Sequence, residues 1–105
     1  MSMGLFDIFK KREKGKVEIF SRKPVGKFKV KEVFEIFERE VVVGEVVEGV
    51  IYPGYKIKGE RAALIREIQK ERRGVDFALE YDLVALVLEG KLNPKAGEIL
   101  EIYQS

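Results

Sequence analysis

The sequence predicts an all-β fold: a small closed or nearly closed antiparallel β-barrel, with a short basic amphipathic element at the N-terminus. The first observation is the run from Val41 to Gly59, in which four glycines punctuate β-branched residues at strand-length intervals. Val, Ile and Tyr suit a pleated, half-buried surface, and Gly beside them marks a bulge or a bend. The second is that six to seven strand-length segments are joined by short turns, which is typical of small barrels.

Residues 1–16 are interpreted as a basic amphipathic arm, followed by a single barrel domain over residues 17–105. Leu5, Ile8 and Phe9 share one helical face, and a group of Lys and Arg residues follows them. The arm fits a terminus docked on the barrel, an interfacial membrane helix or a basic arm that touches RNA. We favour docking, because a helix of about ten residues is marginal in isolation. A membrane surface is therefore not an expected partner.

The segments after Gly15 have strand patterns. Val17 and Ile19 predict a short first strand. Apolar residues then alternate with charged ones from Phe28 to Ile36, which is a period of two. A helix over Lys31–Glu40 also fits the apolar spacing, but no N-cap residue precedes it, and a strand is favoured.

The next strand, Val41–Val47, leads into the sequence Tyr52-Pro53-Gly54-Tyr55, which predicts a tight turn. Pro presets φ at the second turn position, and Gly accepts the positive φ that a type II turn requires at the third. The segment Ala62–Arg72 is ambiguous, because its residues would also make a good helix on propensity alone.

The remaining strands are Leu83–Leu88 and Glu98–Tyr103, separated by a turn at Asn93-Pro94. Val41–Val47 and Leu83–Leu88 are apolar on both faces, whereas a small barrel has only one interior. We therefore expect their outer face to be covered by the N-terminal arm or by a second copy of the chain.

The composition excludes several classes of activity. The chain has no His and no Cys, which removes thiolate and imidazole metal sites and the Cys and Ser–His–Asp nucleophile systems. We expect no enzyme activity and no cofactor. Lys and Glu dominate the charged residues while Asn and Gln are rare, which favours a thermophilic source. No apolar run is long enough to span a membrane and no secretory signal is evident, so a cytoplasmic location is expected.

From Lys29 to Tyr103 the chain resembles the second, β-barrel domain of translational GTPases such as elongation factor Tu. The blocks that carry the resemblance are V-F-E-I-F, the glycine-spaced run, A-L-I-R-E-I-Q, A-L-E-Y-D-L-V-A-L-V-L-E-G and a closing G-E-I-L. The resemblance implies a barrel, and it favours a strand followed by a loop over Ala62–Arg72. No GTPase domain accompanies these blocks.

The resemblance also implies a set of site residues. In elongation factor Tu, the loop after the A-L-I-R-E-I-Q strand and the turn before L-V-A-L help to hold the aminoacylated 3′ end of tRNA. Two positions depart from the family pattern: Gln69 stands where an acidic residue is usual, and Tyr81 replaces the glycine of the A-x-x-G-D turn. The residues implied by position are Gln69, Glu71, Arg72 and Leu83.

Charge points to anionic partners. Residues 1–31 carry a net charge of +7 and residues 32–105 a net charge of −5, so anions should prefer the first third. Lysines on an outward strand face can track a nucleic-acid backbone, but they also protect strand edges from aggregation. The basic loop that follows the A-L-I-R-E-I-Q strand fits a phosphate contact or a solvated loop balanced by Glu67 and Glu71. The candidate nucleic-acid-binding residues are Lys27, Lys29, Lys31, Arg66, Lys70, Arg72 and Arg73.

We therefore expect a stand-alone, non-catalytic binding module that resembles a domain of translation elongation and initiation factors. Its expected partners are tRNA, ribosomal RNA or a translation-associated protein. The alternative is a protein–protein interaction module, which either forms a homodimer or docks on a larger partner.

Overall fold

The computed structural model describes residues 23–104, and these residues form strands, turns and loops. The predicted arm over residues 1–16 and the predicted strand at Val17–Ile19 lie outside the described residues.

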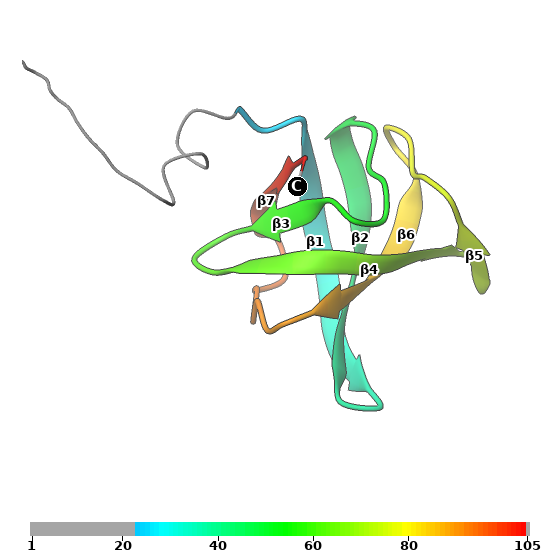
Figure 1. Ribbon diagram of the computed structural model, residues 1–105, viewed down its shortest axis with the longest axis vertical. Helices are drawn as coiled ribbons and strands as arrows, with labels where there is room; N and C mark the ends of the chain where they lie inside the picture. The colour runs from blue at the N-terminus through cyan, green and yellow to red at the C-terminus, as the bar shows by residue number, and fades with distance from the viewer. Residues whose placement is uncertain (1–22, 105) are drawn as a thin grey trace, which may run out of the picture.

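The described chain forms an antiparallel barrel (Figure 1). Hydrogen bonding places the strands in the order β3-β7-β1-β2-β6-β4-β5, and an additional pairing of β3 with β4 closes the first six into a ring. The seventh strand, β5, pairs only with β4 and lies outside this ring. The strands are β1 Gly26–Ile36, β2 Arg39–Gly49, β3 Lys56–Lys58, β4 Ala62–Lys70, β5 Arg73–Val75, β6 Leu83–Glu89 and β7 Ile99–Tyr103.

This architecture confirms the predicted all-β barrel and resolves both ambiguous segments. The alternative helix over Lys31–Glu40 does not form, because this segment is the end of β1, a two-residue turn and the start of β2. The segment Ala62–Arg72 is strand β4 followed by a turn, as the resemblance implies. The turn at Tyr52–Tyr55 is also confirmed: Tyr55 N donates to Tyr52 O at 3.1 Å, and Gly54 has φ of +97°.

The core fills the barrel with aliphatic side chains and one aromatic ring. Alternate residues of each strand point inward, as the period-two pattern predicts. Phe28 and Val30 of β1 pack against Val42 and Val46 of β2. The other fully buried large side chains come from the remaining strands of the ring and the turn before β3; they are Ile51, Ile57, Ile65, Ile68, Leu86, Leu88, Leu100 and Ile102.

Gly44 lies where the backbone of β2 comes very close to the backbone of β1. A Cβ atom at this position would lie 2.0 Å from the carbonyl oxygen of Lys29 and 2.8 Å from the ring of Phe28. No side chain fits there, because atoms in contact need more than 3 Å. Gly44, one of the four glycines in the run Val41–Gly59, is thus required by the close approach of two paired strands.

The outer faces of β2 and β6 carry a second set of apolar side chains. Val41 pairs with Val87, and Val43 with Ala85, in a register that alternates with the inward residues. The adjacent outward residues are Phe34 on β1 and Leu83 at the start of β6, both exposed. We call this surface the outer stripe, and its residues are Phe34, Val41, Val43, Leu83, Ala85 and Val87. The part of the chain that the structure describes does not include the predicted N-terminal cover.

The β1–β2 hairpin extends beyond the ring, at the bottom of Figure 1. β7 pairs with β1 only as far as Lys29, so the distal half of β1 pairs with β2 alone. Phe37 and Glu38 form the turn with φ of +51° and +67°, and the side chain of Phe37 is 94% exposed. Glu40, 2% exposed, accepts hydrogen bonds from the backbone N–H groups of Leu92 and Asn93 at 2.7 and 3.0 Å. This buried carboxylate ties the hairpin to the loop that follows β6.

Candidate nucleic-acid interface

The predicted nucleic-acid-binding residues fall into two groups on opposite sides of the barrel. One group lies on β1 and the other on β4 and the β4–β5 turn. In the closed ring, two strands separate β1 from β4 in either direction. Outward side chains of these two strands therefore point away from each other, and the seven residues do not form one surface.

The β1 lysines lie among acidic residues. Lys27 is an outward residue whose ammonium group is 4.0 Å from the carboxylate of Glu48. Lys29 lies opposite Glu45 across the β1–β2 pair. Lys31 is the exposed extra residue at an irregularity in β1, where Val30 pairs with Gly44 and Glu32 with the next residue, Val43. The positive charge of this group is thus largely offset by β2.

The β4–β5 group is divided by its ion pairs. The guanidinium of Arg66 lies 3.1 Å from the carboxylate of Glu89, and the ammonium of Lys70 lies 3.0 Å from that of Asp82. For Arg72 and Arg73, no carboxylate within residues 23–104 forms an ion pair or hydrogen bond. These two arginines are exposed at the tip of the hairpin, where Arg72 has φ of +70°. They are the cations of this group that remain available for a phosphate.

The residues implied by the family resemblance lie close to this tip. Gln69 pairs with Ala85 of β6. Its side chain therefore shares an outer face with Leu83, which lies two residues before Ala85 in β6. The Gln69 amide donates to the carboxylate of Glu67 at 3.2 Å. Glu71 and Arg72 form the turn itself. The structure therefore brings all four residues to one region, across β4, β6 and the β4–β5 turn.

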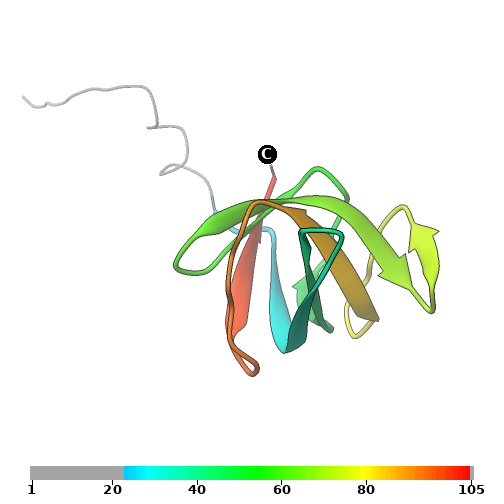
Figure 2. The ribbon, with the colours of Figure 1, turned by 90° about the horizontal axis from the view of Figure 1, so that it is seen from below.

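A hollow of about 500 Å³ lies between the β4–β5 hairpin and the segment before β6. The hairpin contributes Lys70 and Val75, and the following segment contributes Phe77 and Leu79. β5 projects from the ring beside this hollow, at the right of Figures 1 and 2. The basic hairpin and the following segment thus form opposite walls of one concave surface.

Asp82 holds the two walls together. Its carboxylate accepts the backbone N–H of Leu79 at 2.9 Å and the ammonium of Lys70 at 3.0 Å. These hydrogen bonds, the backbone one first, hold the pKa of Asp82 below its ordinary value of 3.8. The carboxylate therefore stays charged at neutral pH and fixes the loop against β4.

Other contacts fix the same loop to the barrel. Ile51 and Ala78 exchange two backbone hydrogen bonds of 2.9 Å each. Gly49 N donates to the Glu80 carboxylate at 3.1 Å, and Tyr81 N donates to Val46 O at 2.7 Å. The loop is thus a rigid platform.

Three exposed aromatic side chains lie on this platform or next to it. The sequence patterns did not predict them as site residues. The rings of Tyr52 and Phe77 have centroids 6.1 Å apart, and Tyr52 also lies 5.4 Å from Tyr55. Tyr81 is 73% exposed and has φ of +75°, at the position where the resemblance implies a glycine. The available signal was that these aromatics occur in turns and loops, where no strand buries them.

Arginine and exposed aromatic rings together suit a single-stranded nucleic acid. Guanidinium groups bind phosphates, and aromatic faces stack on bases. Arg73 pairs with Lys70 and precedes Gly74, two residues that line the hollow, while Phe77 also lines it and Tyr52 contacts Phe77. The β4–β5 side therefore has both components, whereas the β1 lysines lie among carboxylates.

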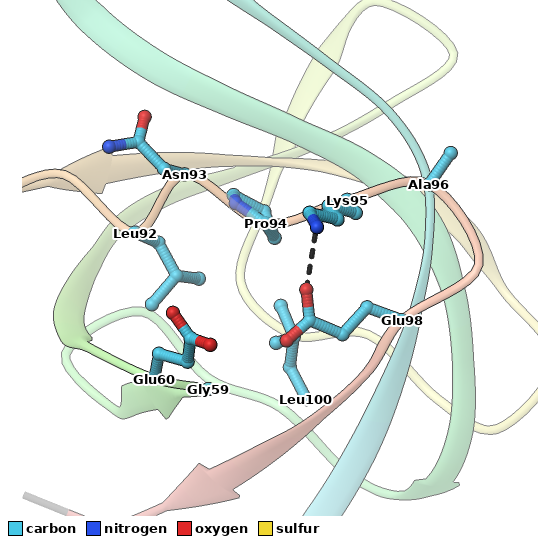
Figure 3. Close-up of a pocket in the computed structure, with 9 residues that line it drawn as sticks. All are labelled: Gly59, Glu60, Leu92, Asn93, Pro94, Lys95, Ala96, Glu98 and Leu100. Carbon is cyan, nitrogen blue, oxygen red and sulfur yellow. Dashed lines mark hydrogen bonds between the residues drawn. The ribbon is translucent and has the colours of Figure 1, made fainter.

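A second hollow, of about 380 Å³, lies between the β3–β4 turn and the loop before β7 (Figure 3). Buried Leu92 and Leu100 contribute to its wall, and Glu60 and Glu98 bring two carboxylates to it. One oxygen of Glu98 accepts the backbone N–H of Lys95 at 2.9 Å. These carboxylates disfavour phosphate at this hollow. Within residues 23–104, no three side chains of metal-binding type come together.

A search of the described residues finds no helix that is long and apolar enough to cross a membrane.

Comparison with known proteins places the barrel in a family context. The family model for elongation factor Tu domain 4 matches residues 23–101. The crystal structure of GDP-bound aIF5B from Aeropyrum pernix is similar over 82% of this chain, with a TM-score of 0.67 and 27% sequence identity. The chain spans only 16% of the length of that aIF5B chain. A comparison with curated proteins gives no match.

Proposed function

The chain belongs to the elongation factor Tu domain 4 family, and from this membership we propose that it is a non-catalytic module that binds RNA of the translation apparatus. The membership confirms the resemblance to a barrel domain of translational GTPases. The matching model is named for domain 4, so the more specific assignment to the second domain is not confirmed. The proposed partners are tRNA or ribosomal RNA, and the proposed location is the cytoplasm.

The observation that carries the proposal is the pair of arginines at the β4–β5 tip, Arg72 and Arg73, which no carboxylate among the described residues pairs with. Arg66 and Lys70 already have carboxylate partners, at 3.1 and 3.0 Å. Arg72 and Arg73 lie in the turn and strand between Lys70 and Gly74, which line the hollow together with Phe77, and Tyr52 is in ring contact with Phe77. This combination supports a phosphate held by the arginines and a base stacked on the aromatic platform.

RNA binding is tested by charge reversal on the two sides of the barrel. The variant R72E/R73E is compared with K29E/K31E, which makes the same change of charge on the opposite side. Loss of two phosphate contacts lowers the slope of log Kd against log salt concentration by about 1.4 for single-stranded RNA. We expect this change for R72E/R73E with tRNA or a ribosomal RNA fragment, and a smaller one for K29E/K31E. Salt-insensitive binding, or equal losses in both variants, contradicts the proposed site.

A second candidate function, protein–protein interaction, is favoured by the outer stripe. This surface is apolar and spans three strands, and its Leu83 end lies toward the β4–β5 tip. Exposed contiguous apolar surface on a small protein is typical of an interface.

A further inference from the structure

The outward side chains of β2 have a self-complementary order. Arg39 stands at one end of the column and Glu45 at the other, with Val41 and Val43 between them. The register of β2 with β6 is regular over Val41–Glu45, so these residues lie on one face at equal spacing. A second column that runs in the opposite direction therefore places a Glu beside each Arg and an Arg beside each Glu.

Consider a two-fold axis that lies in the plane of the interface, at the level of Val42 and perpendicular to β2. This axis would pack two such columns face to face in antiparallel orientation. Arg39 would then face Glu45 of the other molecule, and the half-buried Val43 would lie between the two charge contacts. The same operation is applied to both molecules in a two-fold dimer, so the charge contact occurs twice. We propose that the outer stripe is the interface of a homodimer, in which Arg39 of each copy meets Glu45 of the other.

The charged side chains at the two ends of the column are available for a contact with a second molecule. Glu45 has no ion pair or hydrogen-bond partner for its side chain within residues 23–104. Arg39 lies 4.0 Å from Glu89, a carboxylate that has a closer contact of 3.1 Å with Arg66. The side chain of Arg39 is still 40% exposed. Arg39 thus has only a long contact that a closer carboxylate can replace, and Glu45 lies opposite Lys29 without an ion pair to it within residues 23–104.

The apolar part of the stripe provides the area for association. Phe34 and Leu83 are exposed on either side of the paired valines, Val43, Ala85 and Val87 are half-buried, and Val41 is buried. Sheets that pack face to face keep their strands within about 30° of each other, which suits an antiparallel stack of β2 on β2. Burial of apolar surface drives the association, and the Arg–Glu contacts select this orientation over others.

This inference is independent of RNA binding. Arg72 and Arg73 are not among the residues of the stripe, whose Leu83 end lies toward the β4–β5 tip. The variant R72E/R73E is therefore expected to dimerise like the unmodified chain even if it loses RNA.

The test is sedimentation equilibrium of the full-length chain across a concentration series, without RNA. The unmodified chain should approach twice its mass of 12.1 kDa. R39E and E45R each place like charges opposite one another, so each should weaken self-association at least about tenfold. An equimolar mixture of R39E and E45R should associate again, because each contact then joins a Glu to an Arg.

The matched control is K58E, a reversal on β3, which lies on the opposite side of the ring from β2. It should leave the dimer intact, and thermal unfolding of every variant separates loss of association from loss of folding. A chain that stays monomeric at all concentrations overturns the proposal. A dimer that survives R39E and E45R also overturns it, because another surface then makes the contact. Two monomeric variants that fail to associate when mixed overturn the Arg39–Glu45 pairing.

Discussion

At the scale of single residues, Tyr81 combines a strained backbone with an exposed ring. Its φ of +75° is a conformation in which a side chain with a Cβ atom crowds the backbone. Its ring is 73% exposed, so little packing offsets this strain. A residue that disfavours its own conformation and contributes little to the core is typical of a functional position.

We expect Tyr81→Gly to be more stable than Tyr81→Ala by about 1 kcal/mol in the free energy of unfolding. Both changes remove the ring, but only glycine relieves the strain at positive φ, and this gain exceeds its larger entropy in the unfolded chain. Urea denaturation of the two variants measures the difference. Equal stability would show that the turn relaxes without glycine. Both variants should bind RNA more weakly, because both lack the aromatic face.

The availability of individual charges could not be predicted from the sequence. Arg66, Lys70, Arg72 and Arg73 look equivalent in the printed chain. The structure distinguishes them, because Glu89 and Asp82 reach Arg66 and Lys70 through the pairing of distant segments. The turn at Tyr52–Tyr55 was predictable, since Pro and Gly specify it locally.

At the scale of elements, the link between β4 and the loop before β6 depends on the charge of Asp82. Its pKa is held low by the Leu79 N–H and Lys70. A carboxyl group whose pKa is lower in the folded state stabilises the fold above its unfolded pKa. This stabilisation is lost as the pH falls from about 4 through the folded value.

We expect Lys70→Met to lose stability at neutral pH and to have a flatter acid limb than the unmodified chain. The substitution removes one of the hydrogen bonds that depress the pKa of Asp82, so less stability depends on ionisation of that group. Unfolding free energies measured from about pH 6 to about pH 2 give the comparison. Lys58→Met removes a lysine far from Asp82 and should keep the acid limb unchanged. Parallel acid limbs for all three chains would contradict the assigned role of Lys70.

Most strands could be predicted from the sequence; the exceptions are two segments with ambiguous patterns and the short strand β5. β1 and β4 each fit both a strand and a helix pattern over part of their length. Pairing with β2 decides for the strand in the distal half of β1, and pairing with neighbours on both sides decides for it in β4. β5 was not predicted, because three residues are too few to show a period. Its existence depends on the turn at Glu71 and Arg72, whose positive φ values no sequence rule assigns to those residue types.

At the scale of the whole molecule, closure of the ring depends on a short strand. β3 has three residues, and it joins β7 to β4. Its central side chain, Ile57, is fully buried in the core. β5 has the same length but lies outside the ring, and its Val75 only packs against the core from the edge.

We expect Ile57→Ala to reduce the free energy of unfolding by about 3 kcal/mol, and Val75→Ala by about 1 kcal/mol. The first change leaves a cavity at the point of closure, while the second trims a half-buried residue outside it. Guanidinium denaturation followed by circular dichroism measures both. Similar losses for the two variants would mean that β5 contributes to the barrel as much as β3 does.

The order of strands around the barrel explains why the predicted binding residues separated into two groups. The local pattern identified an outward face on β1 and a basic turn after β4. Which strands become neighbours is set by contacts between residues far apart in the chain, which periodicity does not report. The resemblance to a family predicted the barrel, but not which of the basic residues have ion-pair partners in the described part of the chain.

The first and last strands of the ring are adjacent, and this adjacency has a topological consequence. Val25 N donates to Ile102 O at 2.7 Å, so the backbone enters and leaves the barrel at one place. The turn at Phe37 and Glu38 lies well away from that place, beyond the closed ring. A circular permutant that joins Gln104 to Lys23 through a short linker and opens the chain between Phe37 and Glu38 would keep every strand pairing. The barrel is thus defined by which strands touch, and not by the strand with which synthesis starts.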